Sequence, residues 1–363
     1  MKRIFFTITN DITYDQRMHR ICTSLAENGY EVTLIGYKRK HSVPLKKEKY
    51  KQKRFNLLFL KGGLFYAEYN IRLFIYLLFK KADAVCAIDL DTILPILYIS
   101  KWKKIPRIYD AHELFTEQKE IIRRPSVKKK WQRIENRTLV QFKYGYTVCE
   151  SIAGYFKEKY GVQYEVIRNV TMLRTDLDIT ATRKFVLYQG AVNEARGFEF
   201  LIPAMKEVNS KLIICGDGNF IEELRKLIKE NGVEDKVELK GMLSPEDLWN
   251  ISITVIVGIT IIENYGLNQY FSLPNKFFDY IHAGVPQVAM NYPEYARINQ
   301  QYEVAVLLDE LEPKKIAKAI NNLLNNSVLH NRLRDNCLVA RQELNWQNEE
   351  KKLLKFYQSV FNH

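Results

Sequence analysis

Short apolar runs alternate with amphipathic segments along the chain, and the alternation occurs twice. The first example is an apolar run at 3–8, a segment at 16–28 whose apolar residues share one helical face, and a second run at 31–36. Gly29 ends the middle segment, so these parts predict one strand–helix–strand unit. The whole pattern predicts strands at 3–8, 31–36, 55–60, 84–88, 107–109, 146–149 and 165–167, and then at 185–189, 211–215, 237–239, 254–258, 287–290 and 304–307.

This alternation predicts two doubly wound α/β domains with Rossmann-like parallel sheets. We place the N-terminal domain at 1–170 and the C-terminal domain at 171–345, with the join within 169–182 and a last helix over 346–363. Open parallel sheets bind ligands at the carboxyl ends of their strands. The loops that follow the strands are therefore the places to look for a functional site.

Composition agrees with a large two-domain protein in a reducing compartment. The 363 residues are 47% hydrophobic, and the five cysteines are scattered with no Cys-x-x-Cys pair, so we expect reduced core thiols and no metal site. The N-terminus enters the first predicted strand directly, so we expect no signal peptide. The longest apolar segment, 64–79, is shorter than the roughly 20 residues that cross a bilayer. We therefore predict a cytoplasmic protein.

The net positive charge of the chain comes from its first half. Residues 1–170 hold 33 lysines and arginines against 17 acidic residues, whereas the rest holds 22 against 25. Two basic clusters dominate, at 38–54 and 123–137, and the first leads into an apolar and aromatic stretch at 57–79.

A basic cluster next to aromatic and aliphatic residues is typical of a surface that binds anionic lipids. We predict that residues 38–80 and 119–137 contact an anionic membrane surface, which would make the protein peripheral on the inner face of the cell membrane. A solvated basic surface over an ordinary core helix remains the alternative. Nucleic acid is not an expected partner, because no nucleic-acid-binding motif accompanies the charge.

Two polar loops follow predicted strands in the first half. The loop at 9–17 contains Asn10 and Asp11 but no glycine, which argues against a dinucleotide-binding fingerprint. Its polar side chains can bind a ligand or cap the next helix, with Asp15 as the N-cap. His112 lies beside acidic residues after the fifth strand, where it can bond to a sugar hydroxyl or to a developing charge, or cap a helix.

One loop in the second half has the composition of a diphosphate site. The segment 189–197 leaves a strand and enters a helix, and Gly190, Asn193 and Gly197 keep it small and polar. Helix-start N–H groups bind anions, and the guanidinium of Arg196 can grip a diphosphate with two hydrogen bonds.

The stretch at 270–286 predicts a nucleotide site in more detail. Pro274 begins a helix whose free N–H groups can face a ligand, and Lys276 adds a positive charge. Asp279 lies about one turn further on, where its carboxylate can accept bonds from two vicinal hydroxyls. A diphosphate at the helix start and a ribose at the carboxylate account for the arrangement.

Four segments carry a resemblance to a known family: 10–17, 89–91, 109–113 and 272–280. They resemble the family-4 retaining glycosyltransferases, within a group of bacterial surface-polysaccharide enzymes, and the similarity covers nearly the full chain. The resemblance implies the glycosyltransferase-B fold, with two Rossmann-like domains facing a cleft and the last helix crossing back to the first domain. It also implies metal-independent transfer, with retention of configuration, from a UDP- or GDP-type sugar donor. We expect a lipid-linked glycan acceptor.

The family's functional residues carry over by position. His112 resembles the donor-sugar histidine, Arg196 the basic residue that binds the diphosphate, and Asp279 the carboxylate that binds ribose. We predict His112, Arg196 and Lys276 as catalytic residues and no cofactor other than the nucleotide-sugar co-substrate. The predicted donor-binding residues are Asn10, Asp11, Gly190, Asn193, Gly197, Ser272, Leu273, Pro274, Asn275 and Asp279.

The chain departs from the family at one sugar-contacting position, and two other functions remain open. Phe271 stands where the family commonly has a sugar-contacting glutamate, and we hypothesise that Glu263, Asn264 or Asn268 replaces it. The first alternative is a non-catalytic, membrane-docked partner that binds nucleotide sugar. The second is a nucleotide-sugar 2-epimerase.

Overall fold

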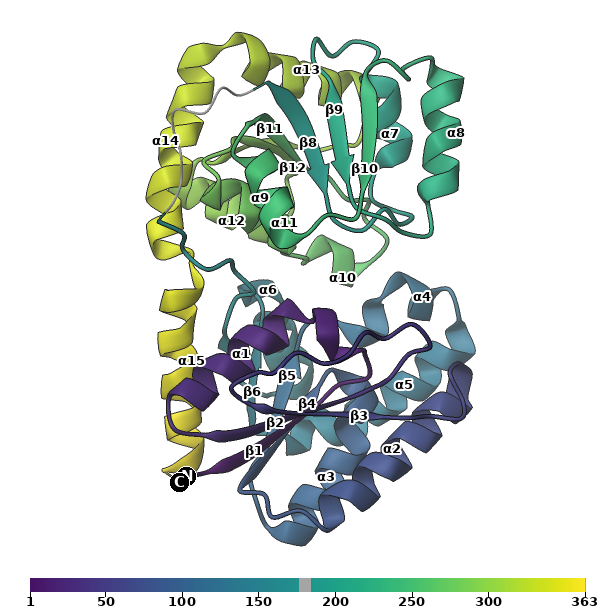
Figure 1. Ribbon diagram of the computed structural model, residues 1–363, viewed down its shortest axis with the longest axis vertical. Helices are drawn as coiled ribbons and strands as arrows, with labels where there is room; N and C mark the ends of the chain where they lie inside the picture. The colour runs from purple at the N-terminus through teal and green to yellow at the C-terminus, as the bar shows by residue number, and fades with distance from the viewer. Residues whose placement is uncertain (176–183, 363) are drawn as a thin grey trace. The chain divides into compact units, whose positions relative to one another are not determined.

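The computed structural model describes residues 1–175 and 184–362, which form two compact units (Figure 1). The N-terminal unit comprises Met1–Arg168 together with the C-terminal segment from Glu349, and the C-terminal unit comprises Asn169–Asn348. Part of the predicted join, 176–182, lies outside the described residues.

The N-terminal unit is built on a parallel sheet of seven strands in the order β3-β2-β1-β4-β5-β6-β7. The order reverses between β1 and β4, which makes the carboxyl ends of these strands the expected ligand site. The strands are β1 (Arg3–Thr7), β2 (Glu31–Tyr37), β3 (Lys51–Phe55), β4 (Ala84–Ile88), β5 (Arg107–Ala111), β6 (Tyr144–Thr147) and β7 (Glu165–Val166). The helices are α1 (Gln16–Glu27), α2 (Gly62–Leu78), α3 (Ile93–Lys103), α4 (Lys119–Ile122), α5 (Pro125–Thr138) and α6 (Glu150–Tyr160).

The C-terminal unit repeats this architecture with six parallel strands in the order β10-β9-β8-β11-β12-β13. Two doubly wound α/β sheets confirm the predicted fold class. The strands are β8 (Phe185–Gln189), β9 (Leu212–Cys215), β10 (Val237–Gly241), β11 (Val255–Thr260), β12 (Gln287–Met290) and β13 (Ala305–Leu308). The helices are α7 (Phe198–Ala204), α8 (Ile221–Asn231), α9 (Pro245–Ser252), α10 (Leu267–Tyr270), α11 (Asn275–His282), α12 (Pro293–Tyr302), α13 (Pro313–Asn325) and α14 (Ser327–Glu343). The chain ends with α15 (Trp346–Phe361), whose residues from Glu349 belong to the N-terminal unit.

Burial explains why the central strands are uniformly apolar. Every residue of β4 is buried, as expected for a strand covered by helices on both faces of a parallel sheet. All five cysteines are buried as well. Asp15 accepts a hydrogen bond from the Met18 backbone N–H at 2.9 Å, which confirms it as the N-cap of α1.

The strand predicted at 55–60 is wrong. The observed strand, β3, begins at Lys51 and ends at Phe55, and only Phe55 is buried in it. β3 lies at the sheet edge, where one side faces solvent and lysines discourage pairing with another chain. An edge strand therefore lacks the apolar run that marks the central strands.

The last helix, α15, completes the N-terminal unit. Its Tyr357 packs against Phe6, and the Tyr357 hydroxyl lies 3.3 Å from that of Tyr146. The two chain ends meet in this unit, since the Lys2 ammonium lies 5.5 Å from the centre of the Phe361 ring (Figure 1). Among the described helices, none is both long enough and apolar enough to cross a membrane.

Candidate functional site

His112 belongs to a chain of charged groups at the end of β5. Its Nε2 lies 3.0 Å from Oδ2 of Asp110, and Arg17 on α1 donates to Oδ1 of the same carboxylate at 2.9 Å. Arg17 also donates to the Ile167 carbonyl at 3.0 Å. Asp110 is fully buried, so the carboxylate is fixed between two cationic groups.

This arrangement favours the protonated form of His112. Burial alone would lower its pKa, but the charge and hydrogen bond of Asp110, with the charge of Asp89, outweigh burial and raise the pKa of His112 to about 9. An imidazolium donates from both nitrogens, and the bond to Asp110 occupies only Nε2. Nδ1 is therefore available to donate to a ligand oxygen.

Two further carboxyl groups follow β4. Asp89 adopts a left-handed backbone conformation, with φ of 53°, and accepts a hydrogen bond from the His112 backbone N–H at 2.9 Å. Burial raises the pKa of Asp89 well above its usual range. Burial also raises the pKa of Asp91 to about 6, against the opposing hydrogen bond from Thr9.

These groups line a cavity of about 480 Å³ at the carboxyl ends of β1, β4 and β5. Its polar lining includes Thr9, Asn10, Asp89, Asp91, His112 and Arg124. Sequence reasoning predicted Asn10 and His112 here but did not assign Asp89, Asp91 or Arg124 to the site. For the two aspartates, the position directly after a buried strand was the available signal.

Asp11, predicted as a donor-binding residue, lies outside this cavity lining. Its carboxylate accepts hydrogen bonds from the Thr13 hydroxyl at 2.7 Å and from Arg54 at 3.0 Å. Asp11 therefore stabilises its own loop and joins it to β3. Asn10 donates to the Asp15 carboxylate at 2.8 Å.

In the C-terminal unit, the amino group of Lys276 is buried. Its side chain sits 3.7 Å from the centre of the Tyr188 ring, and its Nζ has no hydrogen-bond partner among the described residues. Burial lowers the pKa of Lys276 well below its usual range, and the nearby charge of Arg196 lowers it further. Two basic side chains thus share a site, and none of the described carboxylates pairs with Lys276.

The Arg196 loop has a backbone that only small residues permit. A Cβ on Gly216 would lie 1.9 Å from the Gly190 carbonyl oxygen, so the two strand-end loops press directly on each other. Asn193 joins them, since its Oδ1 accepts a hydrogen bond from the Asn219 backbone N–H at 3.1 Å. Gly197, with φ of 76°, is the N-cap of α7 and directly follows Arg196.

Asp279, on α11, accepts hydrogen bonds from two side chains outside that helix. Oδ2 accepts from the Gln189 side-chain amide at 2.8 Å, and Oδ1 accepts from the Thr171 hydroxyl. A carboxylate offers about four acceptor positions, and these two donors occupy two of them. Gln189 immediately precedes Gly190, which connects Asp279 to the Arg196 loop.

The start of α11 lies one residue later than predicted. Pro274 has an extended ψ of 151° and is the N-cap, so the helix begins at Asn275. The first N–H groups of a helix have no acceptor within it, and here they lie at Asn275 and Lys276. Ser272 donates to the Gln269 carbonyl at 2.8 Å, and Leu273 is buried. These two residues therefore stabilise the segment that leads into α11.

Residues 1–175 and 184–362 contain no group of three His, Cys, Asp or Glu side chains arranged to hold a metal ion. The predicted basic and acidic residues of the C-terminal unit instead gather around the end of β8, where they suit an anionic, hydroxyl-bearing ligand.

Two families match the chain in succession. Residues 16–171 match the family described as Glycosyltransferase Family 4, and residues 171–337 match the family described as Glycosyl transferases group 1. A lipopolysaccharide core biosynthesis glycosyltransferase of Rhizobium meliloti is 29% identical over 177 residues, or 47% of this chain and 49% of that protein. The chain spans about half the length of the curated relatives it matches.

Solved structures support the fold over the full length. A sucrose-phosphate synthase from Thermosynechococcus elongatus superposes with a TM-score of 0.84 at 15% identity, covering 100% of both chains. An Anabaena protein solved with UDP and glucose gives a TM-score of 0.72 at 14% identity, covering 99% of this chain and 100% of that one. With two parallel α/β units and family matches from 16 to 337, the chain belongs to the family-4, group-1 glycosyltransferases of the glycosyltransferase-B fold.

Proposed function

We propose that the protein transfers a sugar from a UDP- or GDP-type nucleotide sugar to a glycan acceptor in cell-surface polysaccharide biosynthesis. The observation that carries this proposal is the buried Lys276 ammonium next to Arg196. Burying a charge without a partner lowers the free energy of unfolding by roughly several kcal/mol, and a bound diphosphate would remove that penalty. In this proposal Asp279, three residues further along α11, accepts the ribose hydroxyls.

The proposed reaction keeps the anomeric configuration and needs no metal. The acceptor oxygen forms its bond to the anomeric carbon on the face from which the diphosphate leaves, and the diphosphate takes up the acceptor's proton. Arg196, Lys276 and the amides at the start of α11 stabilise the leaving charge, while His112 orients the sugar. Arg196 and Lys276 would bind the diphosphate of the donor and also stabilise the charge that develops on it, so their loss should lower both donor affinity and turnover.

Glu263 lies close to the Arg196 loop and is a candidate to replace the sugar-contacting glutamate that this chain lacks. The Glu263 backbone N–H donates to the Ala195 carbonyl at 3.1 Å, directly beside Arg196. Asn264 and Asn268 follow on the same loop and α10. We propose Glu263 first among these three as the residue that contacts the donor sugar in place of the glutamate that Phe271 replaces.

The proposal also places the protein on the inner face of the cell membrane, through residues 38–80 and 119–137. A stripe of exposed apolar residues along α2 supports this, since Leu64, Ile71, Ile75 and Phe79 recur at helical spacing and are 52–80% exposed. Such a stripe, at the edge of lysine-rich segments, suits the interface of an anionic bilayer.

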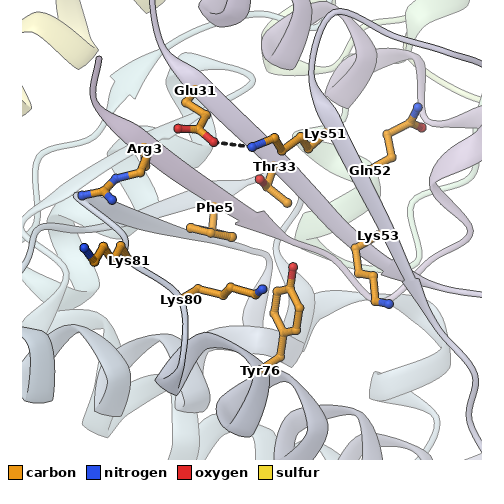
Figure 2. A pocket seen from close by; sticks show the side chains of 10 residues that line it. All are labelled: Arg3, Phe5, Glu31, Thr33, Lys51, Gln52, Lys53, Tyr76, Lys80 and Lys81. Carbon is orange, nitrogen blue, oxygen red and sulfur yellow. Dashed lines mark hydrogen bonds and ion pairs between the residues drawn. The ribbon is translucent and has the colours of Figure 1, made fainter.

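A basic hollow at the amino ends of β1, β2 and β3 adds to this surface (Figure 2). It has a volume of about 490 Å³, and Figure 2 shows lysines from β3 and from the segment after α2 around it. Within it, Glu31 pairs with Lys51. Lys80 and Lys81 directly follow Phe79, so positive charge and an exposed ring occur together.

The test is calorimetric titration of the full chain with UDP, GDP, ADP and CMP. We expect micromolar binding of UDP or GDP, and loss of that binding in Asp279→Ala. Asp235→Ala, at an exposed acidic position in the same unit, is the matched control and should bind as the wild type does. Failure of all four nucleotides to bind would contradict the proposal.

The two alternatives give different outcomes once a donor is found. A non-catalytic partner would bind the nucleotide sugar and leave it unconsumed with any acceptor preparation. A 2-epimerase would convert the donor sugar in the absence of an acceptor. Transfer requires donor consumption that depends on an acceptor from the membrane fraction.

A further inference from the structure

An apolar groove adjoins the His112 cavity in the N-terminal unit. It has a volume of about 670 Å³ and lies among α2, the start of α3, and α4–α5. The side chains that give it an apolar lining include Ala67, Ile71, Leu94, Val127, Trp131 and Ile134. An apolar hollow of this size on the surface calls for an apolar occupant.

The groove is continuous with the candidate site. Tyr66, Asp91, Ile121 and Arg124 line both the groove and the His112 cavity. At its other side the groove includes Ile71, which is 60% exposed and belongs to the apolar stripe of α2. An apolar path therefore connects the surface proposed to face the membrane with the polar cavity.

Two cations and the Asp91 carboxylate line the largely apolar groove. Arg124 and Lys130 both line it, and neither pairs with a carboxylate in the part of the chain that the structure describes. Arg124 is also one of the residues shared with the His112 cavity, so its charge lies where the apolar and polar spaces join. A phosphate at that junction would neutralise it.

We infer that this groove binds the hydrocarbon chain of a lipid-phosphate-linked acceptor, with the phosphate at Arg124 and Lys130 and the glycan in the His112 cavity. This inference rests on the proposed function and specifies its acceptor class. The charge at the junction favours a phosphate-linked chain over a neutral glycolipid, and the apolar lining favours a chain over a soluble glycan.

Small residues keep the groove open. Gly63 and Ala67 lie one helical turn apart on α2, and both line it. A Cβ added at Gly63 would meet nothing within 4 Å, so the space beside this face of α2 is unfilled. A large side chain at Ala67 should therefore occupy the groove without disturbing the core.

The probe is monomeric dodecyl phosphate, added to the full chain labelled with 5-fluorotryptophan. Trp131 lines the groove, and its ¹⁹F signal is assigned with Trp131→Phe. We expect a saturable shift of this signal with dodecyl phosphate and none with inorganic phosphate. Affinity should rise about two- to fourfold for each methylene from hexyl to dodecyl phosphate, the scale of burying a methylene group.

Two comparisons can overturn the inference. Ala67→Phe should weaken dodecyl phosphate binding at least tenfold, whereas Leu64→Phe, on the same helix but outside the groove, should not. Dodecyltrimethylammonium should bind at least tenfold more weakly than dodecyl phosphate. Equal binding by Ala67→Phe and the wild type, or equal binding of the two amphiphiles, would show adventitious detergent uptake only.

The same preparations separate the inference from the proposed function. UDP or GDP binding in the C-terminal unit, measured by calorimetry, reports the donor site independently of the groove. Normal nucleotide binding without dodecyl phosphate binding would reject the acceptor groove alone. Loss of nucleotide binding in every preparation would reject the proposed function.

Discussion

Buried charged side chains in the two units differ in whether a side chain of opposite charge lies beside them. In the N-terminal unit, Asp110 is compensated on both sides by Arg17 and His112. In the C-terminal unit, Lys276 is buried beside another cation and has no such compensation within the described residues. A compensated charge stabilises a geometry, whereas an uncompensated one is explained by a ligand of opposite charge.

Replacing Lys276 by methionine should separate stability from function. Without nucleotide, Lys276→Met should be more stable than the wild type by about 1–3 kcal/mol, because the buried charge is replaced by an apolar chain of similar length. It should also lose the thermal stabilisation by UDP or GDP, and Lys276→Ala and Arg196→Ala should each lose turnover by about a hundredfold or more.

The measurement is the melting temperature of each variant with and without nucleotide. Lys211→Met, at an exposed position of the same unit, is the control and should keep the nucleotide effect. An undiminished shift on nucleotide addition in Lys276→Met would argue against the ammonium as a phosphate ligand.

His112 predicts a pH dependence of stability. Its folded pKa of about 9 exceeds the usual value of 6.5, so its contribution is fully present below about pH 6.5 and is lost as the pH rises through about 9. His112→Gln should therefore be less stable than the wild type by about 2–3 kcal/mol at pH 6, and the gap should narrow by pH 10. Urea unfolding followed at Trp131 measures it. A gap that is the same at both pH values would rule out the ion pair with Asp110 as its source.

At the scale of elements, α2 has three distinct sides. Phe65, Tyr69, Leu73 and Leu77 are buried against the sheet, and Leu64 with Ile75 lies on the exposed stripe. The third side, with Gly63 and Ala67, borders the groove. One helix thus joins the core, the proposed membrane surface and the proposed acceptor site, because residues three and four apart share a face.

Vesicle binding tests the exposed side of α2. Ile75→Glu with Phe79→Glu should reduce binding to vesicles containing 30 mol% phosphatidylglycerol (roughly a physiological anionic fraction) at least tenfold, since acidic groups would face anionic lipid. Lys80→Gln with Lys81→Gln should weaken binding by about 2 kcal/mol and reduce its salt dependence. Flotation in a sucrose gradient measures both.

The control is a matched pair of acidic substitutions in the C-terminal unit. Val339 and Met242 are exposed apolar residues there, 63% and 76% accessible, and Val339→Glu with Met242→Glu should leave flotation unchanged. An equal loss in both pairs would point to net charge alone as the cause.

At the scale of the whole molecule, the chain leaves the N-terminal unit after Arg168 and returns to it at Glu349. The return is anchored by a buried aromatic group, in which Tyr357 and Phe356 pack on Tyr146. Arg168 and Glu349 are joined as well, since the Arg168 backbone N–H donates to the Glu349 carboxylate at 2.9 Å. The N-terminal core is therefore incomplete until the end of the chain is in place.

Truncating Tyr357 should destabilise one unit selectively. Tyr357→Ala should cost the N-terminal unit about 3–5 kcal/mol, the usual cost of removing a fully buried aromatic ring. Urea unfolding followed at Trp131 should move to lower concentration, while the transition reported by Trp249 in the C-terminal unit stays in place. Gln358→Ala, next to it but exposed, should change neither transition.

The sequence alone determined the features that depend on local burial. The strands at 84–88, 185–189 and 287–290 coincide with the observed β4, β8 and β12, because buried parallel strands are continuous apolar runs. The predicted N-cap at Asp15 was likewise readable, since a cap involves residues three positions apart. Of the predicted site residues, His112 and Gly190 directly follow such strands, where the fold places ligands.

Only the tertiary structure decided the features that join distant parts of the chain. Arg17 and Asp110 are 93 positions apart, and nothing local in either segment indicates their pairing. The apolar residues of α2 and α5 look alike whether they fill a core or border a groove. The local sequence pattern indicates how strongly a residue is buried. Hydrogen-bond partners, cavities and uncompensated charges arise from the packing of separate elements, so only the tertiary structure shows them.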